Sequence, residues 1–306
     1  MRPTSASGTD AMVISTAEQD FPCSANHLYW TIAGTTMPET LYPGPAGTSV
    51  VGPGTSARMD SVASKQILRS YPRSRPSLSE AHRRIYVAHY LENREGNGAL
   101  TRLKKSMEAW MHRRVAARQQ GGEILEIGAG TLNHVRFEPK SLVYDAVEPF
   151  RQLWEGRSDV QRLRNLYDSL AAIPEHVRYD RIFSIAVLEH LTDLPGIVAQ
   201  AGLHLRPDGC FQAGIPSEGG FLWGLAWRLT TGISFRLRTG LPYSDIMRHE
   251  HVNTSVDIIA VCSYLFEHVV VHRFPTRSHH FSFYAVIEAH GPRIQRCREL
   301  LGGRSQ

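Results

Sequence analysis

Between residues 123 and 288 the chain alternates short apolar runs with segments whose apolar residues recur at helical spacing. Runs that are apolar at most positions are typical of strands buried on both faces of a sheet. The predicted strands are Glu123–Ile127, Leu142–Val147, Arg181–Ile185, Cys210–Ile215, Val269–Arg273 and Phe281–Glu288. The predicted helices between them are Arg151–Gly156, Leu194–Leu205 and Val256–Phe266. This alternation predicts an α/β domain with an open, mostly parallel sheet covered by helices.

The last two predicted strands are joined by a short link. Only Pro275–His280 separates them, which is too short for the crossover helix that a parallel pair needs. The two strands should therefore pair antiparallel.

The region before residue 120 has a different pattern. Residues 1–65 are rich in Thr, Ser, Gly and Pro without sustained periodicity, which predicts a largely disordered tail. Ser79 and Glu80 then open a helical pattern, and a second helix runs from Ala99 to Gln119. The expected organisation is a tail at 1–65, an N-terminal helical lid at 66–119, the main domain at 120–292 with an insertion at 219–255, and a C-terminal tail at 293–306.

The insertion contains a mixed apolar and basic segment, Phe221–Leu241. It combines large apolar residues such as Trp223 and Trp227 with Arg228, Arg236 and Arg238. One interpretation is a helix that covers the sheet edge. The other is a lid over an apolar acceptor, or a contact with a membrane surface.

The main candidate for ligand binding is the loop Glu126–Thr131, at the carboxyl end of the first predicted strand. Ligands of open α/β sheets bind at this edge. Gly128 and Gly130 let the backbone approach a ligand closely. A dinucleotide-binding loop would have a third glycine at position 133, where this chain has Asn133.

The second predicted strand ends at Val147 and is followed by Glu148. A carboxylate at this point can accept two hydrogen bonds from a ribose diol. Alternatively, Glu148 caps a helix that begins at Pro149. The glycine loop lies 18 residues upstream of Glu148 and favours the ribose role.

Four motifs in order resemble the class I S-adenosylmethionine-dependent methyltransferases. They are Glu123–Thr131, Val147-Glu148, Asp168–Leu170 and Asp180–Leu191, and a turn at Arg206–Gly209 fits the same pattern. The likeness covers roughly residues 120–290. It implies a Rossmann-like, seven-stranded sheet whose last strand is antiparallel, with helices on both faces, and S-adenosyl-L-methionine as cofactor.

The resemblance also implies roles for single residues. Glu126, Gly128 and Gly130 would line the methionine portion of the cofactor, and Glu148 would hold the ribose. Asp168, with Ser169 beside it, would meet the adenine amino group, and Ser184 and Ile185 would flank the sulfonium. Two positions depart from the family pattern. Leu132 replaces a frequent third glycine, and Pro139 shortens the helix that follows the loop.

Methyl transfer to a hydroxyl or a protonated amine needs a general base. The candidates are His190, His249 and His251, each of which has an alternative structural or surface role. We predict no metal site, because residues two apart on a helix face different ways and no further ligand is evident. The expected acceptor is a small molecule or a glycan-type compound, methylated on oxygen or nitrogen.

Composition adds three limits. The four cysteines are far apart, and no apolar run approaches membrane-spanning length, so we expect a cytoplasmic protein. The net charge of +5 comes from helix-like basic segments, so nucleic acid is not an expected partner. Two alternatives stay open: a non-catalytic cofactor-binding subunit and an oxidoreductase with a nucleotide cofactor.

Overall fold

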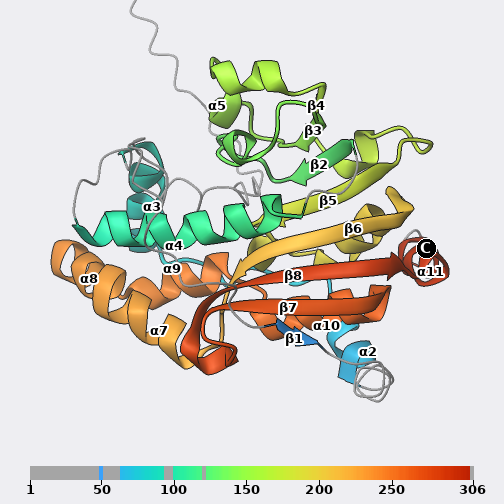
Figure 1. Ribbon diagram of the computed structural model, residues 1–306. Coiled ribbons are helices and arrows are strands. Elements are labelled where there is room, and N and C mark those ends of the chain that lie inside the picture. Colours follow the sequence, from blue (N-terminus) through green and yellow to red (C-terminus); the bar gives the residue numbers. More distant parts are fainter. Residues whose placement is uncertain (1–47, 51–62, 93–98, 119–121, 304–306) are drawn as a thin grey trace, which may run out of the picture.

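The computed structural model describes residues 48–50, 63–92, 99–118 and 122–303. Within these residues one mixed sheet crosses the molecule, with the strand order β1-β7-β8-β6-β5-β2-β3-β4 (Figure 1). The strands are β1 (Thr48–Val50), β2 (Glu123–Ile127), β3 (Val143–Val147), β4 (Asn165–Tyr167), β5 (Tyr179–Ile185), β6 (Leu205–Pro216), β7 (Phe266–Pro275) and β8 (Ser282–Pro292).

Strands β2 to β8 confirm the predicted fold class. Strands β2 to β6 pair parallel, and β8 lies antiparallel between β6 and β7. Each of the six predicted apolar runs forms a strand, and the hairpin after Pro275 is confirmed. The short edge strand β4 was not predicted, because three half-exposed residues give no apolar run.

The helices cover both faces of the sheet. Alternate residues of a strand point to opposite faces, and Leu125 and Ile182 belong to one core cluster while Ile124 and Phe183 belong to the other. The helices of the described residues are α2 (Ala63–Leu68), α3 (Glu80–Glu92), α4 (Ala99–Ala116), α5 (Arg151–Trp154), α6 (Leu194–Leu203), α7 (Phe221–Trp227), α8 (Ile233–Thr239), α9 (Tyr243–Glu250), α10 (Ser255–Leu265) and α11 (Ile294–Gly302). Helices α6, α10 and α11 pack on the first face, and α4 packs on the second.

The connection between β2 and β3 is short, as the sequence predicts. In place of a long helix it has one 3-10 turn, Val135–Phe137. A buried polar network fixes this turn. His134 hydrogen-bonds Glu138, and the guanidinium of Arg181 donates to Glu138 and to the Val115 carbonyl. The glycine loop is thereby anchored to the centre of the sheet.

The insertion after β6 forms a helical layer at the carboxyl ends of the parallel strands (Figure 1). Helices α7 and α8 are continuous through a π-helical turn, Arg228–Gly232. A third core cluster joins this layer to α3, because Tyr86 packs with Phe235 and Tyr243. The N-terminal helices therefore contact the insertion, in addition to the sheet.

Most of the predicted tail at 1–65 lies outside the described residues. Within it, β1 pairs with β7, and α2 begins at Ala63. In the predicted C-terminal tail, α11 packs against α6, and its Cys297 is fully buried.

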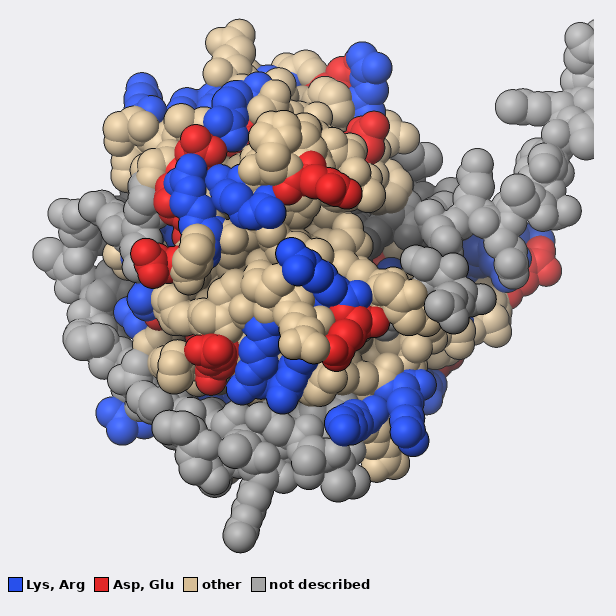
Figure 2. Space-filling model, turned by 90° about the vertical axis from the view of Figure 1, so that its right-hand side faces the viewer, with Lys and Arg blue, Asp and Glu red and all other residues tan. Residues whose placement is uncertain are grey.

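The opposite edge of the sheet, where the parallel strands begin, carries mixed charges (Figure 2). A pocket of about 510 Å³ lies there, and Arg164 and Arg206 line it. Both arginines already form ion pairs, Arg164 with Asp145 and Arg206 with Asp180. Paired charges on an open surface favour a structural role for this pocket. Ligands of open α/β sheets bind at the carboxyl ends of the strands, so the candidate active site lies there.

Candidate active site

The glycine loop follows β2 directly. Gly128 and Gly130 have φ angles of 72° and 52°, in the left-handed region that glycine adopts without strain. A Cβ on Gly128 would lie 2.6 Å from Cγ2 of Val187, so no larger residue fits. Leu132, at the departure from the family pattern, also has a positive φ, of 60°. The backbone keeps a glycine-like turn there, although the residue is leucine.

Glu148 fixes the loop against the end of β3. Its Oε2 accepts a hydrogen bond from the Gly130 amide at 2.7 Å, and its Oε1 accepts one from the Phe150 amide at 2.9 Å. The second bond closes a local turn and is not the helix cap that the sequence left as an alternative, because the helix begins at Arg151 and has no side-chain cap. A carboxylate has about four lone-pair sites, so further hydrogen bonds to Glu148 are compatible with these two. The side chain is fully buried.

The remaining predicted cofactor residues lie along the same edge. Glu126 is buried and accepts a 2.5 Å hydrogen bond from the Tyr144 hydroxyl, and burial raises its pKa to about 8. The Ser184 hydroxyl donates to the Ile127 carbonyl, and Ile185 is buried beside it. Asp168 and Ser169 are exposed after β4.

The loop and its neighbours suit a nucleoside cofactor. The cradle at Gly128 admits no side chain, and a buried carboxylate, Glu148, stands next to it. The ladder pairs Ile127 with both Val147 and Ser184, which brings three strand ends to one place.

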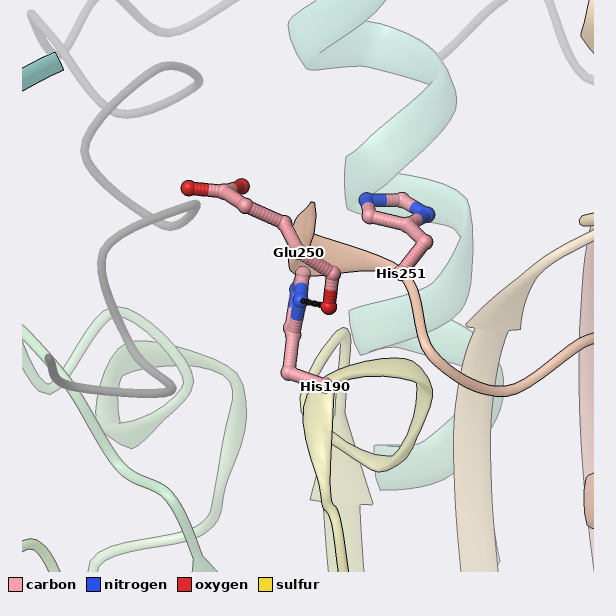
Figure 3. A group of neighbouring side chains, drawn as sticks. All are labelled: His190, Glu250 and His251. Carbon is pink, nitrogen blue, oxygen red and sulfur yellow. Dashed lines mark hydrogen bonds between the residues drawn. The ribbon is translucent and has the colours of Figure 1, made fainter. Parts of the chain in front are cut away.

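Two of the three candidate bases lie together at the ends of β5 and α9. The rings of His190 and His251 meet edge to face, with centroids 4.8 Å apart. His190 Nδ1 donates to the backbone carbonyl of Glu250 at 3.0 Å (Figure 3). His249 does not join them: it binds the Pro76 carbonyl and contacts the Tyr86 ring.

A carboxylate orients His251. The Nδ1 of His251 donates to Oε2 of Glu218 at 2.9 Å, and the Trp223 indole donates to the same oxygen. Burial disfavours the charged imidazole, but the hydrogen bond to Glu218 and the charges of Glu189 and Glu250 raise the pKa of His251. Burial raises the pKa of Glu218, but the hydrogen bond from His251 outweighs it and lowers that pKa. A carboxylate that holds one nitrogen of an imidazole can orient the ring as a base.

Two carboxylates beside the histidines are incompletely paired. Glu189 Oε2 and Glu250 Oε1 are buried without a hydrogen-bond partner in the described part of the chain. Burial raises the pKa of Glu189 to about 7. Ligand atoms of His190, Glu250 and His251 lie within 4.8 Å of one another.

Residues from the N-terminal region hold the two histidine loops together. The Arg75 guanidinium donates to the backbone carbonyls of His190, His249 and Glu250. Arg73 donates to the Val252 carbonyl two residues further on. The sequence did not single out Arg75 or Glu218, since neither lies in a motif and both are distant from their partners along the chain.

A pocket of about 250 Å³ opens next to His251. Its lining combines aromatic, apolar and polar side chains: Glu218, Trp227, Arg228, Ser244, Met247, Arg248 and His251. Most of these side chains are polar or charged, and Trp227 and Met247 supply the apolar surface. In the described residues no helix has the length and apolar character needed to cross a membrane.

Comparisons with known proteins agree with this geometry. A family model described as a methyltransferase domain matches residues 99–216. No curated protein matches.

Three solved structures show the level of structural similarity. A methyltransferase from Thermotoga maritima, described as a possible histamine N-methyltransferase, has 14% identity and a TM-score of 0.44, covering 61% of this chain and 90% of that one. An S-adenosylmethionine-dependent methyltransferase from Clostridium acetobutylicum has 11% identity and a TM-score of 0.42, covering 69% and 98%. The CurJ carbon methyltransferase has 17% identity and a TM-score of 0.44, covering 78% and 69%.

Because these TM-scores lie below 0.5, the assignment rests on the family match and on the strand order. The sheet has the reversed last strand that the methyltransferase resemblance implies. The loop lacks the third glycine of a nicotinamide enzyme. Residues 99–216 therefore form a methyltransferase domain of the class I S-adenosylmethionine-dependent type.

Proposed function

We propose that the protein methylates an oxygen or nitrogen of a small-molecule or glycan-type acceptor, with His251 as general base and Glu218 as its orienting carboxylate. The observation that carries this proposal is the partly buried hydrogen bond between His251 and Glu218, beside a pocket at the carboxyl edge of the sheet. An imidazole held by a carboxylate is the usual arrangement for a base that works near neutral pH.

The cofactor roles follow from the same edge. In this proposal the loop at Gly128 and Gly130 receives the methionine portion, and Glu148 accepts hydrogen bonds from the ribose. Asp168 and Ser169 lie at the adenine end, and Ser184 and Ile185 lie near the sulfonium. Support comes from the common position of these residues at the ends of β2 to β5.

The cofactor supplies a methyl group that is already activated on a sulfonium. The protein's residues then have two tasks, to align the acceptor and to take its proton. With its Nδ1 proton held by Glu218, His251 presents Nε2 as the basic nitrogen. Bound S-adenosyl-L-methionine would supply the methyl group, and His251 would take the proton that the acceptor atom loses.

The pocket lining favours a polar, ring-containing acceptor. Trp227 offers an apolar face, while Ser244 and Arg248 offer hydrogen-bond donors. Such a mixture suits a hydroxyl-rich ring better than a purely apolar compound.

The test is a screen of cell extract with cofactor labelled on its methyl group, followed by mass analysis of each labelled product. An O-methyl or N-methyl product from a small molecule or glycan would support the proposal. A C-methyl product would contradict the proposed oxygen or nitrogen acceptor. Calorimetric binding of cofactor without turnover of any acceptor would favour a non-catalytic subunit instead.

A further inference from the structure

The outer face of the insertion helix is unusually apolar. Helices α7 and α8, with the π turn between them, form one continuous helix from Phe221 to Thr239. Its exposed apolar side chains recur every four residues: Phe221 (61% exposed), Leu225 (39%), Leu229 (58%), Ile233 (47%) and Leu237 (82%). These five are most of the exposed large apolar residues in the described chain. We call them the apolar stripe.

The π turn keeps the stripe on one side. In an α-helix a four-residue step advances about 40° beyond a full turn, so the stripe would wind around the helix. A π turn has more residues per turn, and it lies at Arg228–Gly232, in the middle of the stripe. It offsets much of that drift, so the apolar residues stay together over a length of about 24 Å.

The inner face of the same helix is already occupied. Phe235 is buried against Tyr243, and Trp223 contacts Tyr284 and donates to Glu218. The apolar stripe is therefore not the face that packs on the domain. It also does not line the pocket beside His251.

The charges around the stripe have one sign. Residues 219–244 contain Arg228, Arg236 and Arg238 and no Asp or Glu. All three arginines are exposed, and each is next in sequence to a stripe residue, about 100° away around the helix. They therefore flank the apolar surface.

We propose that the apolar stripe docks this protein on an anionic lipid bilayer, with the helix lying in the plane of the interface. An amphipathic helix with arginines beside its apolar face binds in this way, since apolar burial and attraction to anionic headgroups act together. A second copy of the chain is a poorer occupant, because pairing two such helices would bring their arginines together without a compensating acid.

Docking would also position the active site. Trp223 connects the helix to Glu218, the partner of His251. The acceptor pocket then lies close to the lipid surface. The binding inference itself does not depend on which acceptor is methylated.

The experiment is co-sedimentation of the full chain with vesicles of phosphatidylcholine, with and without phosphatidylglycerol, at low and high salt. We expect binding to the anionic vesicles that weakens with salt. The double variant Arg236→Gln/Arg238→Gln should bind on the order of 30-fold more weakly. Leu229→Ser/Leu237→Ser should weaken binding roughly tenfold or more.

Val256→Ser is the matched control, since Val256 is 51% exposed on α10 and outside the stripe. It should bind like the unchanged protein. Circular dichroism and melting curves will show whether each variant is folded. Absent binding to anionic vesicles, or unchanged binding by a folded Leu229→Ser/Leu237→Ser variant, would overturn the proposal. So would a dimer in size-exclusion chromatography that the same variant dissociates.

Discussion

Two parts of the catalytic edge differ in how their buried acids are paired. In the proposed cofactor half, which we define as β2 to β4 with the loops that follow them, Glu126, Glu138 and Glu148 all accept hydrogen bonds from the protein. In the acceptor half, the loops after β5 and β6 with α9, Glu189 and Glu250 each have a buried oxygen without a partner in the described residues.

The difference separates two uses of buried charge. A carboxylate whose oxygens all accept hydrogen bonds holds the backbone in place, and these bonds contribute to the stability of the fold. A buried carboxylate oxygen without a hydrogen-bond partner destabilises the folded state. Such an oxygen therefore indicates a position that is kept for function. The hydrogen bonds of the cofactor half make it a rigid cradle. In the acceptor half, Glu189 and Glu250 can each still accept another hydrogen bond. The predictions below test this contrast.

The largest effect is expected for His251→Asn. The variant keeps a polar side chain but removes the base, so methyl transfer to the identified acceptor should fall by roughly 10²- to 10⁴-fold. Melting temperature and cofactor affinity should change little. His249→Asn is the control, since His249 lies outside the cluster. Equal activity of the two variants would remove His251 from the mechanism.

Arg181→Leu tests the paired half. The fully buried Arg181 donates to Glu138, and its loss leaves that carboxylate buried without its cationic partner. Unfolding free energy should fall by about 3–5 kcal/mol in denaturant titration. Arg151→Leu breaks an exposed pair with Glu155 and should cost at most about 1 kcal/mol. Similar losses for both variants would show that burial of the ion pair is unimportant here.

Glu148→Ala should weaken cofactor binding by roughly 2–4 kcal/mol in calorimetry, since a ribose diol loses a charged acceptor. The glycine loop also loses its bond at the Gly130 amide. Glu155→Ala, at an exposed acid one helix further on, is the control. A folded Glu148→Ala variant with unchanged affinity would assign Glu148 to the loop alone.

The cofactor half was largely predictable from sequence, and the acceptor half was not. The loop Glu126–Thr131 and Glu148 lie directly after apolar runs, so pattern and position suffice to locate them. Glu218 lies 33 residues before His251, and nothing local marks it as a partner. Arg75 reaches three carbonyls through tertiary folding alone. Residues of the cofactor half lie in short sequence motifs, whereas residues of the acceptor half are brought together by contacts between distant parts of the chain.

The pH dependence of Glu218→Gln tests the orienting role. The base must be unprotonated, so activity should rise with pH through the pKa of His251. That pKa is raised in the protein, partly by Glu218. Without the Glu218 charge, the imidazole should lose its proton at lower pH, and the rising limb should move to lower pH. Glu175→Gln, at an exposed acid outside the site, is the control. An unmoved limb would contradict this pairing.

The smallest effect concerns Leu132, at the departure from the family pattern in the cofactor half. Its φ of 60° costs a non-glycine residue about 1–2 kcal/mol. Its side chain is 1% exposed in the core cluster beneath α4, and burial of a leucine is worth roughly 2–5 kcal/mol on truncation. Burial outweighs the strain, which explains why leucine is tolerated at this turn.

The two terms can be separated by truncating Leu132 in two ways. Both Leu132→Ala and Leu132→Gly lose the packing, but only glycine relieves the positive φ. Denaturant titration should therefore show Leu132→Gly to be more stable than Leu132→Ala by about 0.5–1 kcal/mol. Val261, buried within α10, is the matched control. There glycine should be less stable than alanine by about 1 kcal/mol. The same order at both sites would mean that the turn at Leu132 carries no strain, and the rigid cradle would then be explained by hydrogen bonding alone.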